Sequence, residues 1–200
     1  MTYFKSTFLT ILTLVLISAC TTLPDSSSAL KVKSATELSQ WTARGKILLV
    51  SGKEKESAYF YWRQDRDDFQ FTLSTFIGVD VLSLKYENGI ATLKLDGKSY
   101  SDNDPQRLVA RLTNKQIPFK KLPLWLLGSA VKKDVIDPIY INKTELQSFA
   151  FKESGFNKQT WRINYSEREP VLKLRLPKGM TIKSSDSRIK IAISNWQLEG

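Results

Sequence analysis

The chain has 200 residues, with 30 lysines and arginines, 20 aspartates and glutamates, one cysteine and no histidine. The absence of histidine excludes a Ser-His-Asp or Cys-His catalytic site and removes the commonest metal ligand. The formal charge of +10 would suit nucleic acid, anionic lipid or an acidic protein partner.

The first twenty residues have the parts of a secretory signal peptide. A positive charge near the start precedes an apolar run at residues 8–17 and small residues before Cys20. The run is too short to cross a bilayer, which needs about 20 apolar residues. Ile17-Ser18-Ala19-Cys20 is similar to the lipobox of bacterial lipoproteins, so we expect cleavage after residue 19 and acylation of Cys20. The alternatives are an incidental buried cysteine and an uncleaved anchor.

Export limits what the positive charge can bind. Removal of residues 1–19 leaves a formal charge of +9 on 181 residues. Because the signal peptide directs the chain out of the cytoplasm, nucleic acid is an unsuitable partner. The remaining basic residues are scattered, which favours a solvated surface, with a share available for an acidic partner or anionic head groups. Thr21 stands where an Asp would retain a lipoprotein in the inner membrane. The resemblance to lipoprotein signals therefore implies the outer membrane, with the domain in the periplasm.

The mature chain divides into a tether and one domain. Residues 20–34 hold the acylated cysteine and a stretch rich in Ser and Thr, which we interpret as flexible. Residues 35–200 are enough for one domain with a core of its own. Ser34 and Glu37 form a capping box, which predicts a short helix over residues 35–42 with Trp41 on its apolar side.

Alternation of apolar and polar residues dominates the rest of the domain. A period of two is typical of strands with one dry and one wet face, and Asn88-Gly89 and Asp96-Gly97 mark tight hairpins. The sequence predicts a mainly β protein, an open, unclosed antiparallel β-barrel of about ten or eleven strands. The predicted strands are 46–51, 58–63, 69–73, 82–86, 91–96, 149–152, 161–165, 172–176, 180–183 and 189–193.

Helical signals appear where the alternation stops, between residues 103 and 148. Asp104 followed by Pro105 predicts a helix start, and a second short helix is expected at residues 122–127, before Gly128. The second helix is apolar all round, so it should be buried as a lid or plug on the concave face of the sheet. It either completes a solid core or closes a cavity for an apolar ligand, and periodicity leaves both open.

No motif in the sequence indicates catalysis. Gly97-Lys98-Ser99 matches the end of a phosphate-binding loop, but residue 92 is Thr instead of Gly and no helix pattern follows, so a hairpin turn is the better interpretation. Asp65, Asp67 and Asp68 lie between two strand patterns and are expected to serve a turn. We therefore expect no enzyme activity, no metal and no cofactor.

Several stretches, in order and over nearly all of residues 36–196, resemble the LolB family of outer-membrane lipoprotein receptors. They are Trp41–Lys46, Phe60–Gln64, Gly89–Leu93 with Tyr100, Ile117-Pro118, Leu122–Gly128, Trp161–Tyr165, Leu176-Pro177 and Arg188–Trp196. The resemblance implies an open barrel capped by helices around an apolar cavity. It also implies a monomer that accepts lipoproteins from the periplasmic carrier LolA by their acyl chains and inserts them into the outer membrane without nucleotide hydrolysis.

Two other interpretations stay open. The chain could be an envelope lipoprotein of the same fold that binds another lipid or glycolipid, or a purely structural outer-membrane lipoprotein with a solid core. The candidates for the acyl-chain cavity and its lid are the apolar residues Phe60, Trp62, Phe71, Leu82, Leu84, Leu93, Leu95, Leu124, Trp125, Leu126 and Trp161.

Residues 74–78 join two predicted strands and carry large apolar side chains where a turn is normally polar. They could fold back onto the core. In LolB-like proteins, however, the matching loop projects an aliphatic residue before a glycine and pushes cargo into the membrane. Ile77 and Gly78 hold these places here, while Phe76 stands where the family often has proline. The resemblance thus implies a membrane-insertion loop at Phe76, Ile77 and Gly78.

Overall fold

The computed structural model describes residues 32–153 and 159–199. The expected signal peptide, Cys20 and most of the tether lie outside these residues, so their cleavage and acylation remain predictions. In the described part of the chain, no helix has both the length and the apolar character needed to cross a membrane.

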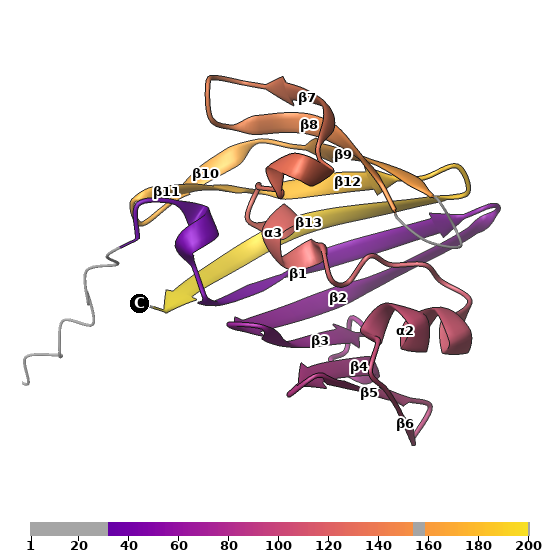
Figure 1. The fold of residues 1–200 in the computed structure, drawn as a ribbon. Helices are drawn as coiled ribbons and strands as arrows, with labels where there is room; N and C mark the ends of the chain where they lie inside the picture. The colour runs from indigo at the N-terminus through magenta and orange to yellow at the C-terminus, as the bar shows by residue number, and fades with distance from the viewer. Residues whose placement is uncertain (1–31, 154–158, 200) are drawn as a thin grey trace, which may run out of the picture.

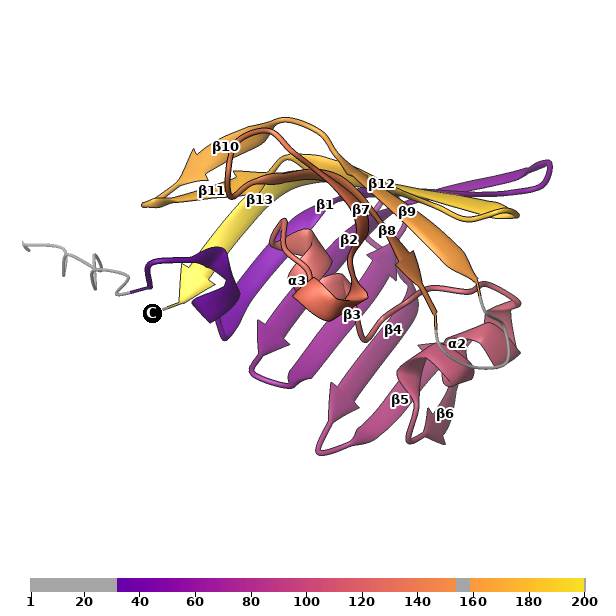
Figure 2. The same ribbon diagram turned by 45° about the horizontal axis from the view of Figure 1, so that its top comes forward.

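One large antiparallel sheet organises the molecule and curves around a hollow (Figures 1 and 2). Its strand order is β6-β5-β4-β3-β2-β1-β13-β12-β9-β8-β7. The edge strands β6 and β7 do not pair with each other within the described residues, so the barrel is open as predicted. The strands of the first half are β1 (Gln40–Ser51), β2 (Glu54–Asp65), β3 (Asp68–Ser74), β4 (Asp80–Glu87), β5 (Ile90–Leu95) and β6 (Lys98–Asp102).

The second half of the sheet follows after the helices. It consists of β7 (Ile136–Tyr140), β8 (Leu146–Lys152), β9 (Thr160–Tyr165), β12 (Gly179–Lys183) and β13 (Ser187–Glu199). The long strands β1 and β13 join the two halves. Their pairing shifts register between Arg44 and Gly45, where a Cβ at residue 45 would overlap the backbone carbonyl of Ala192. Only glycine allows this close approach, and the bulge lets the sheet bend.

A small hairpin was predicted as a single strand, and this prediction is wrong. Leu172, Leu174 and Leu176 do alternate, but β10 (Arg168–Val171) and β11 (Leu174–Pro177) form a separate two-stranded sheet. Leu172 lies in the turn between them with φ of 54° and is 70% exposed. The alternation ran across the turn, so the pattern alone did not reveal it.

The first expected helix is also mostly wrong. Only one 3-10 turn, η2 (Ala35–Glu37), forms, and β1 begins at Gln40, so Trp41 lies in a strand. The Ser34 side chain caps the turn by accepting from the backbone N–H of Thr36, as the sequence suggested. The Glu37 carboxylate, however, accepts from Lys33 and not from the cap residue. The capping box therefore stays incomplete and the turn is not extended.

The other two helices form where they were predicted. In α2 (Pro105–Thr113), the Asp104 side chain accepts from the backbone N–H groups of residues 106 and 107. The short helix α3 (Leu122–Leu126) is followed by Gly128, with φ of 78°. A 3-10 turn, η3 (Lys132–Asp134), leads to β7. Figure 2 shows α3 within the hollow of the sheet and α2 beside β5 and β6.

Candidate functional site

The concave face of the sheet is lined by apolar side chains that the alternation placed there. The predicted residues Phe60, Trp62, Phe71, Leu82, Leu84, Leu93 and Trp161 are all buried in one hydrophobic core. Leu95 is only partly buried and packs against this core from the end of β5. The pairs Leu84–Leu93 and Phe71–Leu84 are directly opposite across strands, which fixes them on the same face.

Aromatic rings fill the half of the hollow next to β1, β2 and β3. The Trp62 ring stacks on Phe69 with 4.8 Å between centroids and on Trp41 with 6.4 Å. Phe119 joins them from outside the sheet and meets the Phe71 ring edge-on at 5.4 Å. Trp41 was predicted in a helix, and Phe119 was not predicted at all because its surroundings have no periodicity.

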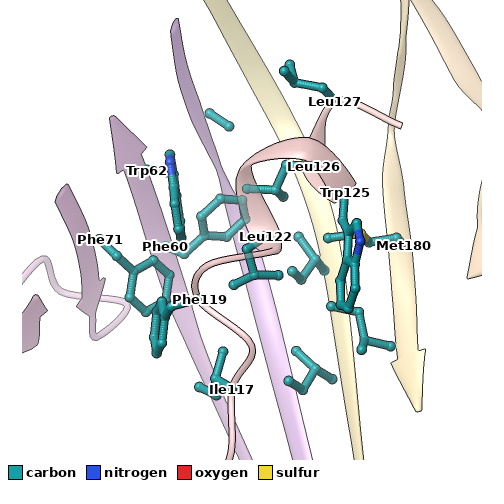
Figure 3. Close-up of a cluster of buried hydrophobic side chains, with 14 of the residues drawn as sticks. Phe60, Trp62, Phe71, Ile117, Phe119, Leu122, Trp125, Leu126, Leu127 and Met180 are labelled. Carbon is teal, nitrogen blue, oxygen red and sulfur yellow. The ribbon is translucent and has the colours of Figure 1, made fainter. Parts of the chain in front are cut away.

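Residues 117–127, which we call the lid, run through the hollow (Figure 3). Ile117, Phe119, Leu122 and Leu126 are buried, together with Trp125. The Trp125 ring meets Phe149 and Phe151 of β8 edge-on, at 5.8 and 5.4 Å between centroids. The lid thus packs on aromatic rings of both halves of the sheet. Leu124, another candidate, is only half-buried.

Polar contacts hold the chain on both sides of α3. Before α3, Lys120 Nζ lies 2.8 Å from Asp104 Oδ2, and Lys121 Nζ lies 2.6 Å from Asp134 Oδ2. After α3, Arg168 donates to the backbone carbonyls of Gly128 and Leu146, at 3.1 and 3.0 Å. A Cβ at residue 128 would collide with this guanidinium group.

The guanidinium group of Arg168 is held inside the protein. Its side chain is only 4% exposed, and burial lowers its pKa, an effect that the nearby Glu145 carboxylate opposes. A buried cation with carbonyl partners is costly to remove, because the carbonyls would lose their donors. Arg168 therefore fixes the chain just after the lid to the start of β8.

In this state the hollow is almost filled. A closed apolar cavity of about 10 Å³ remains between the lid and the sheet, lined by Ile47, Phe60, Trp62, Phe71, Ile117, Leu122, Leu126, Ile189 and Ile191. It is about the size of one water molecule. The interior can therefore take an acyl chain only if the lid moves.

Two larger clefts open to solvent beside the lid. The first, which we call the lid cleft, has a volume of about 700 Å³, and Trp41, Phe69, Phe119 and Leu124 contribute to its walls. The second, also of about 700 Å³, lies at α2 and β8 and is lined by charged side chains. The candidate Leu124 therefore faces the lid cleft and not the closed cavity.

Residues 75–79, which we call the tip loop, leave the sheet altogether. Phe76 is 86% and Ile77 70% exposed, so they do not fold back onto the core. The Thr75 N–H donates to the Val79 carbonyl at 2.8 Å, and the Thr75 hydroxyl accepts from the Val79 N–H at 3.2 Å. Gly78 turns the chain with φ of 84°. The loop thus presents its apolar side chains from a hydrogen-bonded base.

Comparison with known proteins agrees with this geometry. The model of the family described as "Outer membrane lipoprotein LolB" matches residues 39–196. An outer-membrane lipoprotein LolB of Shewanella woodyi is 33% identical over 98% of this chain and 92% of its own length. That of Shewanella sediminis is 32% identical over 94% of this chain and 84% of its own length.

Solved structures share the fold at low identity. A LolA superfamily protein from Nitrosomonas europaea superposes with a TM-score of 0.55, at 8% identity over 82% of this chain and 88% of that one. A DUF1329 family protein from Desulfovibrio piger gives a TM-score of 0.53 at the same identity and coverage. These two proteins thus share the fold of this chain.

Proposed function

The chain belongs to the LolB family of outer-membrane lipoproteins, and from this membership we propose that it accepts lipoproteins from the carrier LolA and inserts them into the outer membrane. It acts as a monomer that is anchored by acylated Cys20. Its cargo is held by the acyl chains. No covalent step is needed, because cargo passes from one apolar environment to the next.

The observation that carries this proposal is the way the hollow is filled. The strands supply the apolar wall, but the lid, a segment outside the sheet, occupies the space between them. Acyl chains can replace the lid's apolar contacts with their own, at about 0.8 kcal/mol for each buried methylene. Burial of several methylenes offsets the contacts that the lid gives up.

The lid cleft offers a route for this exchange. Phe119 and Leu124 belong to the lid and also contribute to the cleft, so an acyl chain in the cleft would already touch the segment that it must displace. Trp41 and Phe69 contribute to the wall of the cleft and also stack on Trp62 in the aromatic part of the hollow. We propose that acyl chains enter here, and that the tip loop completes the transfer at the membrane.

The test is transfer in the absence of ATP and membranes. LolA loaded with an acylated lipoprotein is mixed with the purified chain, and the protein with which the cargo co-purifies is identified. We expect cargo to move to this chain, and the same lipoprotein without acyl chains not to bind. Cargo that stays on LolA, with the chain folded, would overturn the receptor function. Saturable binding of a fluorescent lipid under those conditions would instead favour a lipid carrier that shares only the fold.

A further inference from the structure

Three basic side chains form a row on the outer face of the sheet. Arg188 of β13 pairs directly with Lys183 of β12, and Lys183 pairs with Arg162 of β9. All three are exposed, and the residues next to each of them in the strands point mostly inward. Since directly paired residues share a face about 5 Å apart, the cations lie side by side. We call Arg162, Lys183 and Arg188 the basic row.

Among the described residues, no ion pair neutralises this row. The acidic residue nearest to it in sequence, Asp186 of the β12–β13 turn, is exposed and belongs to none of the ion pairs in the described part of the chain. Among the ion pairs of the described residues, none includes Arg162, Lys183 or Arg188. Strands β1, β9 and β12 contain no acidic residue, and β13 has only Glu199 at its far end. Like charges directly opposite each other destabilise a sheet. An external anion would remove this cost.

The row lies at the end of the sheet that also carries the tip loop. Ser51, the last residue of β1, pairs with Ser187 next to Arg188. Tyr59 of β2 pairs with Ser74, which directly precedes the tip loop. Tyr59 and Val81 are exposed apolar side chains beside the loop, and Lys46 lies over the Tyr59 ring at 5.1 Å. Apolar and basic side chains therefore meet on one surface, the combination that binds anionic membrane interfaces.

The attachment point of the anchor is compatible with docking by the same surface. The chain enters the sheet at Gln40, which pairs with Glu199, at the end opposite the tip loop (Figure 1). The base of the tip loop is level with Ala192, because Ser74 pairs with Tyr59, whose partner Lys46 pairs with Ala192. Ala192 lies seven positions from Glu199, about 23 Å at about 3.3 Å each. The thirteen residues from Cys20 to Val32 are joined by twelve steps and reach at most about 43 Å when fully extended. The tether is therefore long enough for the tip loop and the outer face to lie on the same bilayer that holds the anchor.

We propose that the outer face around the basic row docks on the anionic phospholipid surface, so that the protein lies on its side with the tip loop at the bilayer. The inference rests on the proposed anchor and tip-loop roles, and it adds the lipid charge that the surface selects. The row binds lipid phosphates, while Tyr59 and Val81 sit at the level of the head groups beside the inserted loop.

The experiment uses the acylated chain in vesicles of phosphatidylethanolamine with or without phosphatidylglycerol. Ala192, an exposed outer-face residue of β13, is replaced by Cys and labelled with a fluorophore, which spin-labelled lipid head groups quench on contact. Acylation occupies Cys20, so the label is unique. The variant Lys183→Gln/Arg188→Gln is compared with Lys132→Gln/Lys133→Gln, which removes equal charge from the exposed turn η3.

We expect strong quenching only with phosphatidylglycerol. Each cation near an anionic surface contributes a factor of about five, so the row variant should lower the ratio of docked to undocked protein about thirtyfold, and the η3 variant should not. Equal quenching in both lipids, or equal behaviour of the two variants, would overturn the inference. So would slower cargo acceptance by the row variant without vesicles, because the row would then serve an acidic carrier. Cargo acceptance in the same preparations tests the proposed function separately.

Discussion

The lid and the tip loop are both short apolar segments outside the strands, but the lid is buried and the tip loop is exposed. The lid crosses the hollow and buries Phe119 and Trp125 against both halves of the sheet, whereas Phe76 and Ile77 are largely exposed. Burial makes the lid part of the core, so its movement costs stability. Exposure leaves the apolar surface of the loop available to a membrane. One segment should therefore control binding and the other delivery.

The largest effect is expected in the lid. Trp125→Ala removes a buried ring from between Phe149 and Phe151 and should lower the free energy of unfolding by about 3–5 kcal/mol. Phe76→Ala, a large-to-small change in the tip loop, should change it by less than about 0.5 kcal/mol. Urea denaturation measures both. Similar losses in the two variants would break the contrast between the segments.

A smaller loss is expected where Arg168 holds the end of the lid. Arg168→Met leaves the carbonyls of Gly128 and Leu146 without these donors, and we expect about 2 kcal/mol of lost stability. Hydrogen exchange of the lid amides should become faster before that of the strands. Arg175→Met is the control, because Arg175 is exposed and also pairs with Glu145. Equal exchange in both variants would mean that Arg168 does not hold the lid.

The tip loop should affect delivery and not stability. Ile77→Glu removes the burial of one Ile side chain in the membrane, about 1.5–3 kcal/mol, so insertion should slow at least about tenfold. Leu172→Glu is a matched control, since Leu172 is also 70% exposed but lies in the β10–β11 turn. Cargo acceptance from LolA should be normal in both. Normal insertion by Ile77→Glu would remove the tip loop from the mechanism.

Much of the wall of the hollow could be predicted from the sequence, because a period of two assigns faces without any knowledge of the partners. Leu82, Leu84 and Leu93 were placed in this way. Phe119 could not be, since it lies in an irregular stretch whose position depends on what it packs against. Trp41 was misplaced because the capping signal at Ser34 and Glu37 is local, while the pairing of β1 with β13 is not.

The basic row on the outer face could not be predicted from sequence patterns either. Lys183 and Arg188 are five positions apart and flank the turn of the β12–β13 hairpin, but Arg162 is 21 positions before Lys183 and nothing in its local pattern brings it beside them. The register of β9, β12 and β13 does so. The exposure of Ile77 likewise depends on where β3 ends and β4 begins in the sheet and not on its own segment. Alternation thus predicted which residues point inward, while long-range pairing decided which of them meet.

The smallest effect is expected at the ion pair between Lys121 and Asp134, which is partly exposed. Such pairs contribute about 0.2–1 kcal/mol, so Asp134→Asn should barely change the unfolding free energy. The pair joins the lid to η3, however, and its loss should speed the uptake of a fluorescent acyl chain by up to about fivefold. Added salt should produce the same acceleration in the unchanged protein by screening the pair.

The matched control is Glu87→Gln, which removes a comparable surface pair with Lys85, 2.7 Å apart on β4 and outside the lid. Its uptake rate should equal that of the unchanged protein. Faster uptake in Asp134→Asn alone would mean that opening of the lid limits access to the hollow. Equal uptake in both variants would place the rate-limiting step elsewhere, and the contrast between a lid that controls binding and a loop that controls delivery would then rest on Arg168 and the aromatic contacts of Trp125.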